Sequence, residues 1–281
     1  MKSVITILVL IFAININAQN FTGKATYKTS RKSNMTFGDN QEGVTDKMQE
    51  ELRKRIQKMN QKTFILEFDK ISSTYKEDVK LDAPKPQVGG NRVMVMSFGG
   101  SGNGSIYYKN TQEKRFANQT EIMGKVFLIK DSLPNYDWEL SSETKNIGKY
   151  TCYKATFSRE VENISMSMMN GESKEVKKKE TVVTTAWYTT QVPISNGPDD
   201  YQGLPGLILE INDGKKMIVC TEIVLNPSET IKINEPEKGK VVSQDKFNEI
   251  QTKKSKEMME KFKSRNGVDM GNGVRVKMGG N

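Results

Sequence analysis

Few side chains in this sequence could carry out chemistry, and one missing residue type is informative. The 281-residue chain contains no histidine, so it lacks the commonest general base and the commonest ligand of transition metals. Triads of the Ser-His-Asp or Cys-His kind are therefore excluded. Asp199 and Asp200 are adjacent carboxylates in a loop with proline and glycine, but the side chains of neighbouring residues on a turn point apart. Acids in such loops usually stabilise the turn itself. The sequence predicts no catalytic site.

Methionine is the residue type that suggests a metal. The chain has 15 methionines, and several lie in Gly-rich or Lys-rich stretches where no core is expected. Soft thioethers select Cu(I), so closely spaced methionines could bind copper without histidine, although methionine also fills cores and coats binding surfaces. Copper binding is therefore the alternative hypothesis, with Met94, Met96, Met166, Met168 and Met169 as ligands. The leading interpretation requires no cofactor.

The first 18 residues have the layout of a secretory signal peptide. Lys2 precedes an apolar run at 4–14, and small and polar residues end at Ala18 before Gln19, which predicts cleavage near Ala18. No cysteine follows that site, so a lipid anchor is not expected. No later segment is apolar enough to span a membrane. These features predict export to the periplasm or the outer cell envelope.

The charge balance is basic but favours no particular partner. The formal net charge is +9, and it falls to +8 after cleavage because Lys2 is the one charged residue of the signal peptide. A basic balance permits loose association with anionic lipid, glycan or nucleic acid. The positive charges are spread through Lys-rich segments without a nucleic-acid-binding motif, so binding to nucleic acid is not predicted.

Two cysteines, Cys152 and Cys220, are present. In an oxidising compartment an even pair suggests one disulfide. Two buried free thiols are the alternative, and the choice stays open because the separation of the Cα atoms cannot be derived from sequence.

A short stretch near residue 205 resembles a known family. Its residues are Gly203-Leu204-Pro205-Gly206-Leu207-Ile208. They spell the signature of the GLPGLI family of exported bacterial proteins, whose function is unknown. Other matching positions are Asp137-Trp138-Glu139, Tyr150 to Ala155, Ala186 to Thr189 and Gly197-Pro198. The resemblance covers roughly residues 20–235, and it implies export, an envelope-associated protein and a mainly antiparallel β fold.

The signature itself predicts a turn and a buried strand. Leu204 to Leu207 is typical of a type II turn, with Pro205 and Gly206 at its centre. The apolar run Leu207 to Ile211 is typical of a strand buried on both faces. Asp213-Gly214 predicts a two-residue hairpin, which would place Ile211 opposite Lys216, Leu209 opposite Ile218 and Leu207 opposite Cys220. The return strand is expected at 216–225.

Residues around the signature are candidates for ligand or partner binding, because aromatic and Pro-Gly residues could line a concave sheet. They are Trp187, Tyr188, Pro198, Tyr201, Leu204 and Pro205. The alternative is that Trp187, Tyr188 and the apolar run of the signature are simply core.

The remaining elements predict a mainly β (α+β) fold, with one large curved antiparallel sheet or half-barrel. A first strand at 21–30 is followed by an amphipathic helix at 40–61, with apolar residues at spacings of three and four, and by a hairpin at 63–79. Short strands continue from 106, and a charged helix is expected at 243–265. The domain division is a signal peptide at 1–18, a β domain at 19–235 with flexible inserts near 83–105 and 159–180, and a charged helix with a Gly-rich tail at 236–281.

These observations together predict an exported, non-enzymatic binding or scaffold protein of the cell envelope. Its partner would be an envelope protein or an apolar ligand, sheltered by analogy with carriers built from bent sheets. A methionine-based copper-binding or copper-tolerance protein is the alternative.

Overall fold

The structure is a computed structural model that describes residues 21–31, 61–79, 104–169 and 172–266. Four expected features therefore lie outside the described residues, wholly or nearly so. They are the signal peptide, the amphipathic helix at 40–61, the Gly-rich insert near 83–105 and the tail after residue 266.

The described residues form one open sheet of twelve strands in the order β12-β6-β5-β4-β3-β2-β1-β11-β10-β9-β8-β7. The strand bounds are β1 Gly23–Arg31, β2 Lys62–Phe68, β3 Ser72–Glu77, β4 Ile106–Asn110, β5 Arg115–Ile122, β6 Lys125–Ser132, β7 Glu139–Ile147, β8 Tyr150–Met169, β9 Glu172–Thr189, β10 Leu207–Asn212, β11 Lys216–Leu225 and β12 Lys240–Val242. Neighbouring strands are antiparallel, except that β12 runs parallel to β6. The prediction of a mainly β fold with one large antiparallel sheet is confirmed.

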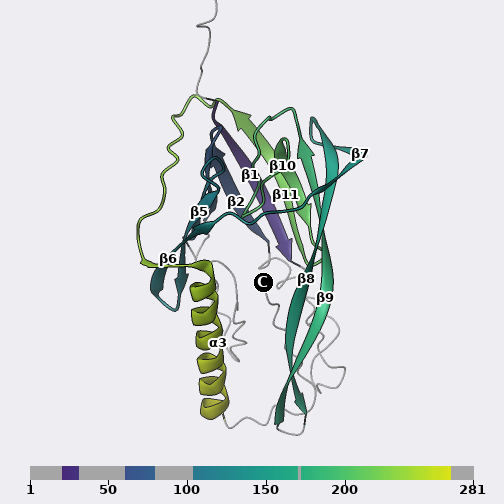
Figure 1. Cartoon of the computed structure of the whole chain (residues 1–281). Coiled ribbons are helices and arrows are strands. Elements are labelled where there is room, and N and C mark those ends of the chain that lie inside the picture. The colour runs from purple at the N-terminus through teal and green to yellow at the C-terminus, as the bar shows by residue number, and fades with distance from the viewer. Residues whose placement is uncertain (1–20, 32–60, 80–103, 170–171, 267–281) are drawn as a thin grey trace, which may run out of the picture.

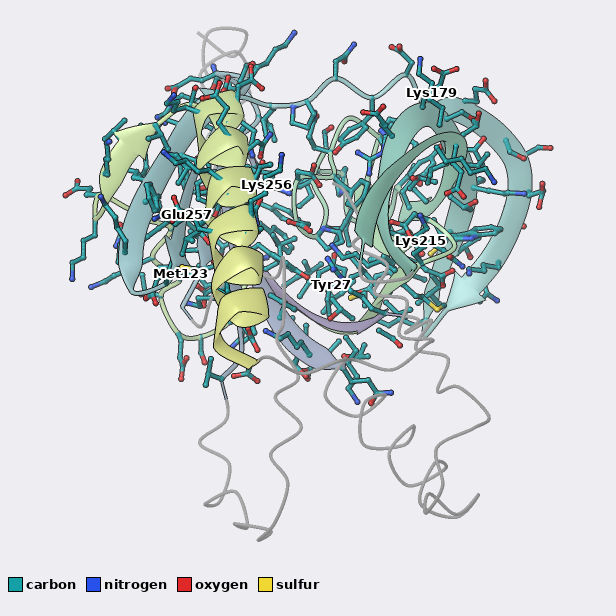
Figure 2. All side chains as sticks on the ribbon, turned by 90° about the horizontal axis from the view of Figure 1, so that it is seen from below. Tyr27, Met123, Lys179, Lys215, Lys256 and Glu257 are labelled. Carbon is teal, nitrogen blue, oxygen red and sulfur yellow. The ribbon has the colours of Figure 1, made fainter. Side chains whose placement is uncertain are left out.

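The sheet curves (Figure 1), and one side of it holds the main core. We call this the inner side. Along β1 buried residues alternate with more exposed ones, so that Ala25 and Tyr27 point into the core, as expected for a strand with one wetted face. Figure 2 shows Tyr27 in the middle of the molecule, between the helix α3 (Gln244–Asn266) and the hairpin of β8 and β9. By contrast, all residues of β10 from Leu207 to Ile211 are buried, as the apolar run predicts.

The turn before β10 differs from the prediction. The described glycines with positive φ do not include Gly206, so the turn at Leu204 to Leu207 is not of type II. Instead, Gly206 N donates a hydrogen bond to Leu204 O (2.8 Å) and closes a three-residue turn around Pro205. Glycine is required for another reason, because a Cβ at Gly206 would lie 2.1 Å from Thr189 O. The missing side chain lets the turn lie directly against β9.

The hairpin after β10 is two residues longer than predicted. Ile211 pairs with Ile218 rather than with Lys216, and Asn212 pairs with Met217. Asp213 stabilises the longer loop, because its Oδ1 accepts hydrogen bonds from Lys215 N (2.9 Å) and Lys216 N (2.6 Å). A slip of two residues preserves which side chains face the core, so the predicted return strand at 216–225 agrees with β11.

A flexible insert was expected at 159–180, but residues 159–169 and 172–180 lie in regular strands. β8 and β9 pair continuously from Tyr153↔Tyr188 to Met169↔Glu172. The prediction missed this because the lysine-rich run that includes Lys174 and Lys177 to Lys179 suggested a solvated insert, whereas the pairing of backbone amides does not depend on side-chain type. The result is a long two-stranded ribbon, residues 157–184, that extends past the sheet (Figure 1).

The C-terminal segment completes the other end of the sheet. β12 pairs with β6, and α3 begins beside it, where Ser243 Oγ accepts a hydrogen bond from Lys246 N (3.3 Å) and caps the helix. Phe247 is buried against Phe127. In the structure α3 covers Gln244–Asn266, close to the span expected for the charged helix. No helix among the described residues is long and apolar enough to cross a membrane.

Candidate functional site

The segment 190–206, which we call the signature loop, folds onto the inner side of the sheet. It has no regular strand, so its backbone groups pair with individual partners: Leu207 N donates to Val192 O (3.0 Å) and Ile208 N to Asn196 O (2.9 Å). The loop's apolar side chains, Val192, Ile194, Tyr201 and Leu204, all belong to the main core. The loop is therefore part of the folded interior and not a mobile cover.

A second segment, residues 134–138, locks the signature loop from outside. Trp138 Nε1 donates to Gln202 O (2.9 Å), and Gln202 Nε2 donates to Pro134 O (2.8 Å). The ring of Tyr136 stacks on that of Tyr201, with centroids 5.6 Å apart. These contacts explain why an aromatic pair before β7 accompanies the signature in the sequence.

A buried lysine holds the signature loop from the sheet side. Lys109 on β4 is fully buried, and its Nζ donates to Gly197 O (2.6 Å) and Tyr201 O (3.1 Å). Burial lowers the pKa of Lys109 to about 7, against the opposing attraction of the Asp200 and Asp199 carboxylates. Both amine contacts are made within the protein, so Lys109 organises the loop and is not exposed to a substrate.

The carboxylates of Asp199 and Asp200 take different partners. Asp199 has φ +55°, a left-handed conformation unusual outside glycine, and its Oδ2 accepts from Lys216 Nζ (2.6 Å). Burial opposes ionisation of Asp199, but the Lys216 ammonium outweighs it and lowers the pKa. Asp200 Oδ2 accepts from Tyr136 Oη (2.7 Å). Burial and the neighbouring Asp199 charge raise the pKa of Asp200. The two acids point to different partners, as expected of turn residues.

The structure brings some of the sequence-predicted site residues together and separates others. Pro198, Tyr201 and Leu204 are buried within the signature loop, and Tyr188 is core on β9. Pro205 is exposed at the turn before β10. Trp187 adjoins Tyr188 along the strand and therefore faces the other side of the sheet. These six residues do not form one ligand surface.

Trp187 instead covers an ion pair on the outer side. Lys145 Nζ binds both carboxylate oxygens of Glu210, at 2.7 and 2.8 Å, and lies 4.4 Å from the centre of the Trp187 ring. Glu210 is 8% exposed. A buried carboxylate requires such pairing, and Lys145 provides it.

The two cysteines are buried free thiols in the structure, rather than a disulfide. Their strands are not neighbours, because β10 and β9 lie between β11 and β8. Burial raises the pKa of Cys152 to about 11 and that of Cys220 to about 12.

Comparison with known proteins places a family of unknown function on this same region. Residues 138–210 match the family described as "Protein of unknown function (Porph_ging)". The match begins at Trp138, whose indole donates to Gln202 O, and ends at Glu210, the acid that pairs with Lys145. No curated protein matches the chain.

Solved structures match more of the chain but only loosely. Two crystal forms of PNGF-II match 83% of this chain, with 12% and 11% sequence identity and TM-scores of 0.46 and 0.45. The match covers 33% of the solved chain in both cases, so this protein spans about a third of its length.

Two residues that hold the signature loop could not be found from the sequence: Lys109 and Tyr136. Lys109 lies on β4, 88 residues before Gly197, whose carbonyl oxygen it binds. The available signal was a strand that carries Tyr107 and Lys109 two positions apart, which puts both on one face.

No metal centre emerges from the described residues, among which no group of three or more Cys, Asp or Glu side chains could hold an ion. Of the methionines proposed for copper, Met94 and Met96 lie outside the described residues. The other three, Met166, Met168 and Met169, lie at the far end of β8.

Proposed function

We propose that this chain is an exported, non-enzymatic binding or scaffold protein of the cell envelope, and that the β8–β9 ribbon engages its partner. The GLPGLI signature and the match to a family of unknown function involve the same segment, which supports assignment to that group of exported proteins. The proposal includes a half-barrel whose edge strands, β12 and β7, do not pair with each other. An open half-barrel would leave the ribbon accessible to a partner.

The observation that carries this proposal is the unpaired length of the ribbon. The ladder between β7 and β8 ends at Glu139↔Thr156, and the ladder between β10 and β9 ends at Asn212↔Thr185. Beyond these positions the described strands pair only with each other. A two-stranded hairpin is marginally stable by itself in water, so the ribbon gains most from a third strand or surface.

The ribbon also has the chemistry of an interaction element. Open strand edges accept an extended segment of another protein by β-strand addition. Lys178, Lys179 and Thr181 are exposed, and the Val183 side chain is 51% exposed. Figure 2 shows Lys179 on the ribbon, far from α3. The signature loop contributes little exposed surface by comparison, because its apolar side chains are core.

A photoreactive amino acid at Val183 tests the proposal in the native envelope. We expect a discrete cross-linked adduct from this position, and none from Met123, which is equally exposed (56%) at the opposite end of the sheet. Excess unlabelled protein should suppress the adduct. A competitor in which Asn-Gly replaces residues 160–181, joining the register pair Arg159 and Val182, should not. Equal adducts from both positions, or suppression by the shortened protein, would contradict a role for the ribbon.

Copper binding by methionine is the second proposal, with Met166, Met168 and Met169 near the end of β8 as the ligands. Met166 and Met168 are two positions apart on β8, and closely spaced thioethers are ligands that select Cu(I). We expect the purified protein to take Cu(I) from a colorimetric chelator, and the combined Met166→Leu, Met168→Leu and Met169→Leu protein to lose this ability. Met217→Leu is the control. Unchanged binding in the triple variant would exclude this site.

A further inference from the structure

The two edges of the β8–β9 ribbon are not equally accessible. β9 pairs with β10 up to Asn212↔Thr185, and the loop that connects β10 to β11 follows directly. Lys215 Nζ of this loop lies 3.5 Å from Glu180 Oε2 on β9, and Figure 2 shows Lys215 beside the ribbon. The loop therefore occupies the place that an added strand would need next to residues 180–184 of β9.

The β8 edge has no such cover among the described residues. The ladder between β7 and β8 begins at Glu139↔Thr156. Before Glu139 the chain turns away from the line of β7, since Trp138 N donates to Tyr136 O (3.0 Å). The rings of Trp138 and Tyr136 each lie 4.8 Å from that of Phe157, between centroids. Phe157 belongs to the main core, so this segment covers the inner face of β8 and leaves its edge open.

The backbone of β8 suits the addition of a strand. Its pairing with β9 is regular as far as Met169↔Glu172, and no proline or glycine interrupts residues 157–169. Such an edge presents unpaired N–H and C=O groups to an extended segment. Antiparallel pairing is slightly more stable per residue than parallel pairing. An added antiparallel segment would run in the same direction as β7 and end beside Glu139, as a continuation of that strand.

The outer face of this edge is acidic. Side chains alternate between the two faces of a strand, and Phe157 is core, so Glu160 and Glu162 face outward. Both are exposed, and their register partners on β9 are Thr181 and Lys179. Opposite charges directly across two strands stabilise the pair, whereas like charges destabilise it. A strand added to β8 is therefore stabilised by basic side chains at alternate positions.

We propose that the partner of the ribbon presents an extended segment with lysine or arginine at alternate positions, which adds antiparallel to the β8 edge opposite Glu160 and Glu162. The side chains between the basic ones lie beside Val161, which is half-buried, and apolar β-branched residues suit such positions. The chain as a whole is basic, with a formal net charge of +9, and would attract acidic partners in general. The local acidic row selects the opposite. This inference rests on the proposed function, because it names the edge and the chemistry of the same partner.

A short peptide in which lysine alternates with valine is the probe, and calorimetry with the full chain measures its binding. We expect saturable binding that is weaker by roughly fivefold in the Glu160→Gln, Glu162→Gln protein. The control is the Glu229→Gln, Glu237→Gln protein, which loses two exposed acids between β11 and β12 and should bind as wild type. The Glu160→Lys, Glu162→Lys protein should instead prefer a peptide in which glutamate alternates with valine.

Amide hydrogen exchange locates the bound peptide. We expect added protection at alternate amides within residues 157–162 of β8, because every second residue directs its N–H group to the free edge. Residues 178–184 of β9 should exchange as they do without peptide. Added protection at 178–184 alone would place the peptide on the other edge and overturn the proposal.

Other outcomes would overturn it as well. They are equal binding of the glutamate peptide to wild type, and undiminished binding by the Glu160→Gln, Glu162→Gln protein. Binding that appears only after Arg275→Ser and Lys277→Ser would assign the edge to the chain's own residues 274–278, where basic and apolar residues also alternate. A cross-link from Val183 in the envelope without any peptide binding would remove this inference and keep the proposed function. Loss of both would remove the two together.

Discussion

Gly206→Ala should be among the most destabilising single substitutions in this protein, lowering the free energy of unfolding by roughly 4 kcal/mol or more. The Cβ would lie 2.1 Å from Thr189 O and 2.6 Å from Thr189 C. Both atoms belong to the backbone of β9, so neither can rotate away. Relief requires the signature loop and β9 to separate, which also weakens the hydrogen bond from Leu207 N to Val192 O. Urea unfolding measures the loss.

Gly214→Ala is the matched control for this effect. Gly214 has φ +83°, and a Cβ there would meet nothing within 4 Å. The substitution therefore costs only the strain of a left-handed alanine, about 1 to 2 kcal/mol. If both substitutions cost the same, the close approach of Gly206 to β9 does not determine the stability of the signature loop.

The second large effect concerns pH. The free energy of unfolding should rise by roughly 2 to 3 kcal/mol between about pH 7 and pH 9, at 1.36 kcal/mol for each unit over which one proton is released on folding. Burial lowers the pKa of Lys109 from 10.5 to about 7 in the folded protein. Below pH 7 both states carry the charge, so the full cost of burying it is present. As pH rises above 7 the folded protein loses the proton that the unfolded chain keeps, so the cost declines.

Chemical denaturation at several pH values measures this slope. The range ends near pH 9 because burial raises the pKa values of Cys152 and Cys220, and such groups destabilise the folded state at higher pH by ionising only in the unfolded chain. Lys109→Met should remove the rise, while Lys178→Met, at an exposed position of the ribbon, should keep it. A flat wild-type profile would show that Lys109 keeps its proton throughout.

Local patterns predicted most elements well where the chain has a clear period or an uninterrupted apolar run. The buried strand Leu207 to Ile211, the return strand at 216–225 and the C-terminal helix all follow from neighbouring residues. Burial of apolar side chains is the dominant favourable term in folding, and its periodicity is visible without knowing the partners. The ribbon was missed because its lysine-rich run suggested a solvated insert, although backbone pairing does not depend on side-chain type.

The errors around the signature have a different origin. Proline followed by glycine permits a type II turn, but whether glycine is needed for its φ or for lack of a side chain depends on what lies against it. Only the position of Thr189 decides that. The hairpin register was wrong for a related reason, because Asp213 uses its side chain to bind Lys215 N and Lys216 N and so favours a longer loop over the two-residue turn.

The loop site could be predicted least. Asp199 and Asp200 were visible as a pair, but the side chains that hold this loop come from distant parts of the chain. Lys109 comes from β4, and Tyr136 comes from the segment before β7. No local pattern links such residues, since their proximity results from strand order. The pKa shifts have the same origin, because they depend on burial and on neighbouring charges.

The sequence by itself determined that this chain is built mainly of β-strands, that it lacks histidine-based chemistry and that a Pro-Gly signature precedes a fully buried strand. These properties depend on residue type and on spacing along the chain. The tertiary structure alone decided that Gly206 serves close packing, that Lys109 supports the signature loop from within and that Asp199 and Asp200 bind different partners. These depend on distances between atoms that only the folded sheet brings together.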